Sequence, residues 1–227
     1  MKNTLTTTLA AAALAAAAGM AAPVYAEDTQ TYEVTVTNIT KSMRFTPILT
    51  VSHNRDVSAF TLGGAPSAGL ADLAEGGATG ALLAEMEAAG RVFDSTTSAE
   101  VLGPPPLLGP GESVTMTIDS RAGRRLLSMA AMLLPTNDTF MGLNAVRLPR
   151  EGSATFFARA YDAGSEPNDE FCANIPGPTC GGEGTSASEG GEGFVHVASG
   201  IHGIADLDPA VYDFNNPAAR VVVTRVR

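Results

Sequence analysis

Several residue types that support common functions are scarce in this 227-residue chain. It has no tryptophan, two cysteines and three histidines, and its 14 Lys and Arg residues are outnumbered by 24 Asp and Glu residues. The formal net charge of -10 argues against nucleic-acid binding, because neutralising phosphates requires clustered basic side chains. The acidic balance suits calcium or a basic partner better, although acidic composition is also common in exported proteins that bind nothing charged.

A hydrophobic run of the kind found in leaders occurs once, at the N-terminus. Residues 1–3 include a positive charge, residues 5–22 form an Ala-rich apolar run, and a small-residue cleavage pattern ends at Ala26. This order predicts a secretory signal peptide over residues 1–26, and it is the reason to prefer a leader over an Ala-rich helix of the folded domain. No second apolar segment follows and no lipobox cysteine is present, so we expect no transmembrane segment and a secreted or periplasmic product.

The mature chain, residues 27–227, is predicted to be a single domain that is mainly β. The composition of the full 227 residues, 44% hydrophobic and 17% charged, is enough to bury one substantial core. Alternating apolar and polar residues over positions 32–37 predict a strand with one wet face. Similar patterns predict strands over residues 48–52, 114–118, 154–160, 194–198 and 220–226. Residues 126–134 are apolar on both faces except for Ser128, which predicts a central buried strand.

Two short helices are predicted within this sheet framework, over residues 67–75 and 79–89. Thr79 and Gly90 match the preferred first and last positions of the second helix. The Gly- and Glu-rich residues 181–193 are too polar to pack, so they are predicted to form a mobile surface loop. The fold class that follows is a mainly β framework with short inserted helices.

The two cysteines, Cys172 and Cys180, lie close together in a segment that proline and glycine bend back on itself. In the oxidising compartment that the leader implies, this spacing predicts a local disulfide. The alternative is a soft-metal site, but such a site needs more donors than two thiols without a nearby histidine supply.

Carboxylates follow two of the predicted strands. Asp138 lies in a loop over residues 135–142, directly after the buried strand, and Asp162 and Glu166 lie in a later turn that Gly164 makes flexible. Calcium accepts about six to eight oxygen ligands in irregular geometry, so side chains from two such loops suit it. The spacing is not that of an EF-hand. An equally weighted alternative is that Asp138 and Asp162 are turn residues that cap their own backbone.

The order of these motifs resembles the spondin N-terminal domain family. The most specific motif is the Asp-Ala-Gly-Ser-Glu run at residues 162–166, paired with Pro135 and Asp138 upstream. The resemblance spans nearly the whole mature chain, over residues 32–38, 45–53, 63–75, 124–143, 162–166, 212–213 and 219–223.

The resemblance implies a C2-like antiparallel β-sandwich in which Asp138, Asp162 and Glu166 hold Ca²⁺. Glu166 stands where animal members of the family usually have Asp, and Phe140 and Tyr161 take the place of family tryptophans. The implied function is adhesion or extracellular binding without a catalytic step, and we expect a monomer. The sequence does not identify the partner among extracellular proteins, glycans and lipid surfaces.

The alternative function is a secreted hydrolase. The histidines are His53, His196 and His202, and no serine lies in a Gly-x-Ser-x-Gly elbow, so a Ser-His-Asp hydrolase is poorly supported. His202 is the most loop-like and would be the catalytic candidate, acting with nearby carboxylates. Those carboxylates are Asp206, Asp208 and Asp213. His196 lies in a strand-like run, where a hydrogen-bonded sheet position is the better interpretation.

Overall fold

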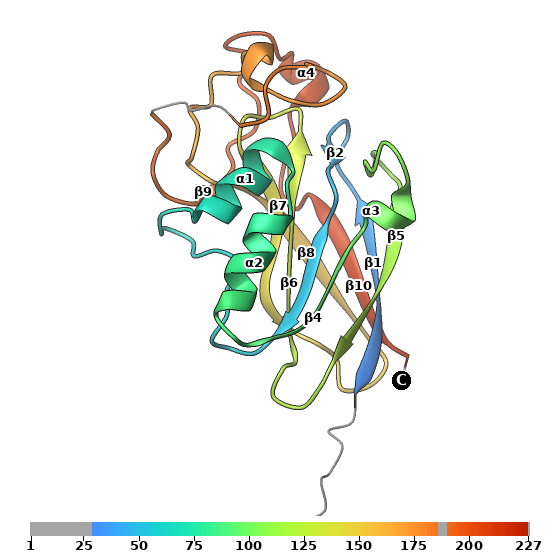
Figure 1. The fold of residues 1–227 in the computed structure, drawn as a ribbon. Helices are drawn as coiled ribbons and strands as arrows, with labels where there is room; N and C mark the ends of the chain where they lie inside the picture. The colour runs from blue at the N-terminus through green and yellow to red at the C-terminus, as the bar shows by residue number, and fades with distance from the viewer. Residues whose placement is uncertain (1–28, 186–189, 227) are drawn as a thin grey trace, which may run out of the picture.

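The computed structural model describes residues 29–185 and 190–226, and the predicted leader lies outside these residues. The strands follow one hydrogen-bonded path in which every pairing is antiparallel (Figure 1). Along this path the order is β4 (Val92–Thr97), β3 (Leu49–His53), β6 (Leu126–Leu134), β7 (Thr139–Arg147), β8 (Ser153–Asp162), β10 (Ala219–Arg225), β1 (Gln30–Asn38) and β5 (Ser113–Ser120). Two short strands, β2 (Arg44–Phe45) and β9 (His196–Val197), pair with β6 and β8.

The prediction of a mainly β fold is confirmed, with differences in detail. The predicted strands coincide with β1, β3, β5, β6, β8 and β10, whereas only two residues of the 194–198 segment form a strand, β9. Strands β2, β4 and β7 were not predicted. Because β7 begins at Thr139, the predicted loop over residues 135–142 is wrong in its second half, and Asp138 directly precedes a strand.

The sheet curls until its two end strands, β5 and β4, approach each other. The Asp119 backbone N–H of β5 donates to Asp94 Oδ2 of β4 at 2.7 Å, and Ser52 Oγ donates to the Asp119 carbonyl at 2.6 Å. Strand β8 crosses both halves of the sheet, because residues 153–158 pair with β10 and residues 159–162 pair with β7. The result is a nearly barrel-like antiparallel sheet, and the C2-like two-layer sandwich is not confirmed.

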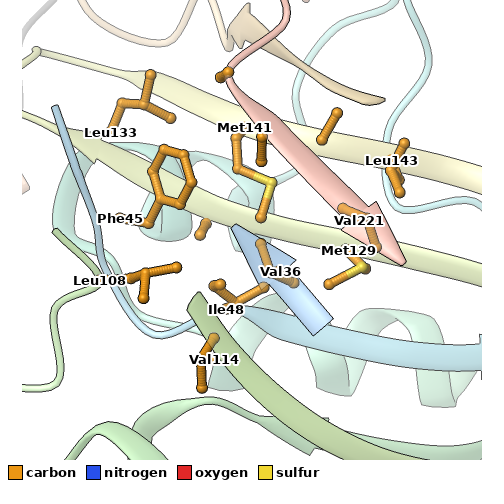
Figure 2. Packing of buried hydrophobic residues seen from close by; sticks show 14 of the residues in the cluster. Val36, Phe45, Ile48, Leu108, Val114, Met129, Leu133, Met141, Leu143 and Val221 are labelled. Atoms are coloured by element: carbon orange, nitrogen blue, oxygen red, sulfur yellow. The ribbon is translucent and has the colours of Figure 1, made fainter. Parts of the chain in front are cut away.

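Strand β6 lies between two clusters of buried side chains. Leu127, Met129 and Leu133 belong to the cluster enclosed by the sheet, together with residues such as Phe45 (Figure 2). Ala130, which points the other way, belongs to the second cluster. Because both faces of β6 are covered, an apolar residue is favoured at nearly every position, as predicted for a central buried strand.

The second cluster lies under the helices α1 (Ala68–Gly76) and α2 (Gly80–Ala88), which agree with the predicted helices to within a residue or two. Ser67 caps α1, since its Oγ accepts a hydrogen bond from the Leu70 N–H at 3.2 Å. Leu70 and Leu73 of α1 then pack over the sheet with Phe140 of β7. The C-terminal end of α1 places Glu75 in a buried position.

The segment after β8 gathers at one end of the sheet, where Figure 1 also shows α4 (Pro209–Tyr212). Cys172 and Cys180 form the predicted disulfide there, with their Cα atoms 4.7 Å apart. The other short helices are α3 (Ala99–Leu102) and a 3-10 turn at Cys172–Asn174. Within the part of the chain that the structure describes, no helix is long and apolar enough to cross a membrane.

Candidate metal centre

The antiparallel pairing of β7 with β8 places Asp138 beside Asp162. Thr139, the first residue of β7, pairs with Asp162, the last residue of β8, and the Ala163 N–H donates to the Asp138 carbonyl at 3.2 Å. One position further into the sheet, Phe140 pairs with Tyr161, and both rings pack against Phe60. The two residues proposed in place of family tryptophans therefore form an aromatic cluster next to these carboxylates.

Asp138 is fully buried and uses only one of its carboxylate oxygens for hydrogen bonds. Its Oδ2 accepts bonds from the backbone N–H groups of Ser165 at 2.8 Å and Glu166 at 3.1 Å. Its Oδ1 is buried and accepts no hydrogen bond from any described residue. Burial raises the pKa of Asp138 to about 7, and the charge of Asp162 adds to this effect, while the hydrogen bonds from Ser165 and Glu166 oppose it.

Asp162 is also buried, and its loop is shaped around it. Its Oδ1 accepts from the Gly164 N–H at 2.8 Å and its Oδ2 accepts from Asn168 Nδ2 at 2.8 Å. Gly164 has a φ of +67°, and a Cβ there would lie 2.4 Å from the carbonyl oxygen of Phe194, so only glycine fits. Burial is the main reason that the pKa of Asp162 is raised.

Two further carboxylates are buried at the same end of the sheet. Glu166 is 2% exposed, and its backbone N–H holds Asp138. Glu75 of α1 is 5% exposed, and its pKa is raised mainly by burial, with a hydrogen bond to Ser165 lowering it and the charge of Glu166 raising it. Glu75 was not predicted as a site residue. It lies in α1, far along the chain from Asp138 and Asp162, and no sequence motif links that helix to their loops.

His196 of β9 completes the cluster, and it was not predicted as a site residue. It pairs with Asp162 across the sheet, and its Nε2 lies 3.3 Å from Asp162 Oδ1 and 3.7 Å from Glu192 Oε2. Burial lowers the pKa of His196, but the hydrogen bond to Val197 and the charges of Asp162 and Glu192 raise it, and the net effect is a raised pKa. The prediction of a sheet position is right, but the ring faces carboxylates.

Glu192 belongs to the Gly-rich segment that was predicted to be too polar to pack. Residues 186–189 lie outside the described part, but the end of the segment packs closely. The Gly193 N–H donates to the Gly164 carbonyl at 2.8 Å, and a Cβ on Gly191 would lie 2.4 Å from the same carbonyl oxygen. The prediction that this segment is too polar to pack is therefore wrong for residues 190–193. Their glycines lack a Cβ and so allow the backbone to lie close to the 162–166 loop.

The arrangement concentrates negative charge in a buried place. Among the described residues, neither Lys nor Arg forms an ion pair with Asp138, Asp162 or Glu75. Unbalanced buried carboxylates are costly, because desolvation and mutual repulsion both disfavour the ionised forms. Oxygen donors from a short turn and the 162–166 loop match the ligand set of a hard divalent cation, and the buried Oδ1 of Asp138 offers an open coordination position.

The other histidines have different surroundings. His53 is buried, with Nδ1 2.6 Å from the Asn54 carbonyl and Nε2 2.8 Å from Ser128 Oγ. His202 is exposed, and in the described part of the chain no serine hydroxyl bonds to it. Its Nδ1 lies 4.0 Å from Glu170, whose two oxygens already accept from the backbone N–H groups of His202 and Ile204.

The three acidic residues near His202 accept hydrogen bonds from backbone N–H groups. Asp206 accepts from Cys172, Asp208 from Ala210, and Asp213 from Ile201 and Phe214. These are contacts with backbone N–H groups, and they differ from the nucleophile-histidine-carboxylate relay of a hydrolase.

The comparison with family models agrees with the motifs in the sequence. The model of the spondin N-terminal domain, Spondin_N, matches residues 30–171, which is more than half of the chain and includes Asp138, Asp162 and Glu166. A comparison with curated proteins finds no match. A spondin domain and a disulfide both fit an extracellular or secreted protein. The chain belongs to the spondin N-terminal domain family.

Proposed function

We propose that this protein is a secreted calcium-binding module in which Asp138, Asp162 and Glu166 bind Ca²⁺. The observation that carries the proposal is the carboxylate of Asp138, which is fully buried and has one oxygen without a hydrogen bond from any described residue. A cation at this oxygen would convert the repulsion between Asp138 and Asp162 into attraction to a shared positive charge.

The chemistry of the donors favours calcium over magnesium. The carboxylates come from a turn, a strand end and a loop, and Ca²⁺ tolerates such irregular sets whereas Mg²⁺ demands near-ideal octahedral geometry. Glu75 adds negative charge from α1. The bound ion would join the 135–138 turn to the 162–166 loop, so its first role would be structural.

A binding or adhesion role outside the cell is the function we propose for the module as a whole. Family membership and the disulfide support an extracellular setting. The surroundings of His202 offer no support for the hydrolase alternative, because its carboxylate neighbours are engaged by backbone N–H groups. The proposed partner is an extracellular protein, glycan or lipid surface, and the proposal includes no catalytic step.

Calorimetric titration of Ca²⁺ into wild-type protein and the Asp162→Asn variant tests the calcium proposal. We expect a dissociation constant on the order of 10⁻⁴ to 10⁻³ M for wild type, as in extracellular calcium modules. Asp162→Asn should weaken binding at least about tenfold, or about 1.4 kcal/mol, because a charged ligand is lost. Asp56→Asn is the matched control, since Asp56 is exposed and pairs with Arg91. Equal affinities for wild type and Asp162→Asn would overturn the proposal.

A further inference from the structure

His196 differs from the other two histidines in having a buried ring nitrogen that no donor satisfies. Both ring nitrogens of His53 lie within hydrogen-bond distance of a partner, and the His202 ring is exposed. In His196, Nδ1 lies 3.1 Å from the Val197 carbonyl, which can only accept, so in the neutral ring Nδ1 carries the proton and Nε2 presents its lone pair. Nε2 is shielded from solvent and accepts no hydrogen bond from a described residue, and its polar neighbours are the carboxylate oxygens of Asp162 and Glu192. Metal-binding histidines commonly use this backbone bond to fix the tautomer.

Two carboxylate oxygens face this nitrogen at distances that suit metal coordination. Asp162 Oδ1 lies 3.3 Å and Glu192 Oε2 lies 3.7 Å from His196 Nε2, and the three donor atoms all lie within 4.8 Å of one another. Bond lengths of about 2.0 to 2.2 Å around a tetrahedral zinc ion place neighbouring donors roughly 3.3 to 3.6 Å apart. Glu192 is the most exposed of the three, at 41%, and a small movement of its side chain would close the set.

The backbone holds the donors in place. Strand pairing sets His196 opposite Asp162, and the Gly193 N–H donates to the Gly164 carbonyl, which anchors the segment that carries Glu192. The Phe194 ring packs against the His196 ring with a centroid distance of 5.3 Å. The carboxylate of Asp162, 3% exposed, is oriented by bonds from the Gly164 N–H and Asn168. Oriented ligands of this kind are typical of built metal sites rather than of solvated surface charges.

The neighbouring Asp138 adds to the negative charge around Asp162. The neighbouring Asp138 side chain is fully buried, and its Oδ1 accepts no hydrogen bond from the part of the chain that is described. This carboxylate interacts electrostatically with Asp162, so both groups experience the same local excess of negative charge.

We propose that His196, Asp162 and Glu192 form a site for a borderline-soft transition-metal ion of the Zn²⁺ class. An imidazole nitrogen suits Zn²⁺, whereas Ca²⁺ takes oxygen ligands. This set should therefore prefer a different metal ion from the one that suits Asp138, Asp162 and Glu166. Three protein ligands leave a fourth position for water or a donor from a partner. Glu192 and His196 lie beyond the residues that the family model matches. The zinc-class site shares Asp162 with the calcium set but does not depend on calcium binding.

Spectroscopic titration with Co²⁺, followed by competition with Zn²⁺, tests the site on protein without a histidine tag. We expect wild type to show the intense visible bands of low-coordinate Co²⁺ and to lose them when Zn²⁺ is added. The His196→Gln variant should weaken Co²⁺ binding by more than about 100-fold, the upper end of what the loss of a second-shell partner costs. The Glu192→Gln variant, which changes a side chain that is 41% exposed, should weaken it at least about tenfold.

The matched control is His202→Gln, which removes a histidine beside a buried carboxylate whose oxygens are already hydrogen-bonded. This variant should bind Co²⁺ as wild type does. Wild-type spectra without bands at millimolar Co²⁺, or wild-type affinity in the Glu192→Gln and His196→Gln variants, would overturn the proposal. Calcium titration of the same wild-type protein is a separate measurement, so failure of one site is distinguishable from failure of the other.

Discussion

Buried carboxylates in this protein fall into two kinds at the scale of single residues. Glu170 is buried, but its two oxygens accept from the backbone N–H groups of His202 and Ile204, so the fold supplies the donors that water would have supplied. Asp138 has donors at one oxygen only. The first kind is stable by itself, whereas the second leaves an electrostatic cost that a proton or a cation can remove.

This cost predicts how the stability of calcium-free protein depends on pH. The pKa of Asp138 is about 7 in the folded protein, against an ordinary value of 3.8. Between about pH 4 and pH 7 the folded state therefore binds more protons than the unfolded state, and the free energy of unfolding falls as pH rises. The raised pKa of His196 acts in the same direction. In the presence of a chelator, the melting temperature should be higher at pH 5 than at pH 7.5.

The Asp138→Asn variant identifies the source of this pH dependence, because an asparagine keeps an oxygen for the N–H groups of Ser165 and Glu166 but does not titrate. Its melting temperature should change less between pH 5 and pH 7.5 than that of wild type. A wild-type protein that becomes more stable as pH rises through this window, without calcium, would contradict the prediction.

At the scale of elements, the end of β8 and the segment before β9 depend on each other. The 162–166 loop can lie against residues 190–194 only because Gly164 and Gly191 have no Cβ. The hydrogen bond from the Gly193 N–H to Gly164 and the pairing of His196 with Asp162 then hold the two segments together. A change in this contact should therefore affect the position of every metal-binding side chain in the two segments.

The Gly164→Ala variant tests this dependence. The new Cβ would lie 2.4 Å from the Phe194 carbonyl oxygen at a positive φ, so we expect a loss of at least about 3 kcal/mol in unfolding free energy and weaker calcium binding. Gly152→Ala is the matched control, because Gly152 also has a positive φ but its Cβ would meet nothing within 4 Å. This control should lose only about 1 to 2 kcal/mol. Denaturant unfolding of both variants measures the difference, and equal losses would argue against the contact.

At the scale of the whole molecule, segments far apart in the chain meet at one end of a curled sheet. The β6 to β7 turn, the loop after β8, the end of α1 and the segment before β9 each place an ionisable side chain there. A cation bound by several of these segments stabilises the folded state as a whole, because the unfolded chain does not hold its ligands together.

Calcium should accordingly raise the melting temperature of the protein. With a dissociation constant on the order of 10⁻⁴ to 10⁻³ M, 10 mM Ca²⁺ contributes about 1.4 to 2.7 kcal/mol by mass action. For a domain of this size, that corresponds to a rise of roughly 3 to 10 °C in a calorimetric scan. Mg²⁺ at the same concentration is the control and should have a smaller effect. Identical scans in calcium and in chelator would contradict the prediction.

Local patterns determined much of this protein. The alternation in β1, the apolar run of β6 and the helix-forming residues of α1 and α2 each reflect contacts that one face of a short element makes, so they are visible within a few residues. The spacing of Cys172 and Cys180 is local in the same sense. The motifs around Asp138 and Asp162 were sufficient to predict the family.

Tertiary structure decided the rest. Strand β4 is half-buried at every position, so its sequence shows no alternation of apolar and polar residues. Strand β7 begins soon after β6 ends, so its first residues resemble a loop. The curl of the sheet depends on how β8 bridges its two halves. Glu75, Glu192 and His196 approach the carboxylates only through contacts between residues distant in the chain, and such contacts have no local pattern. The sequence alone therefore determined which carboxylates were candidates, whereas packing decided which other side chains lie beside them.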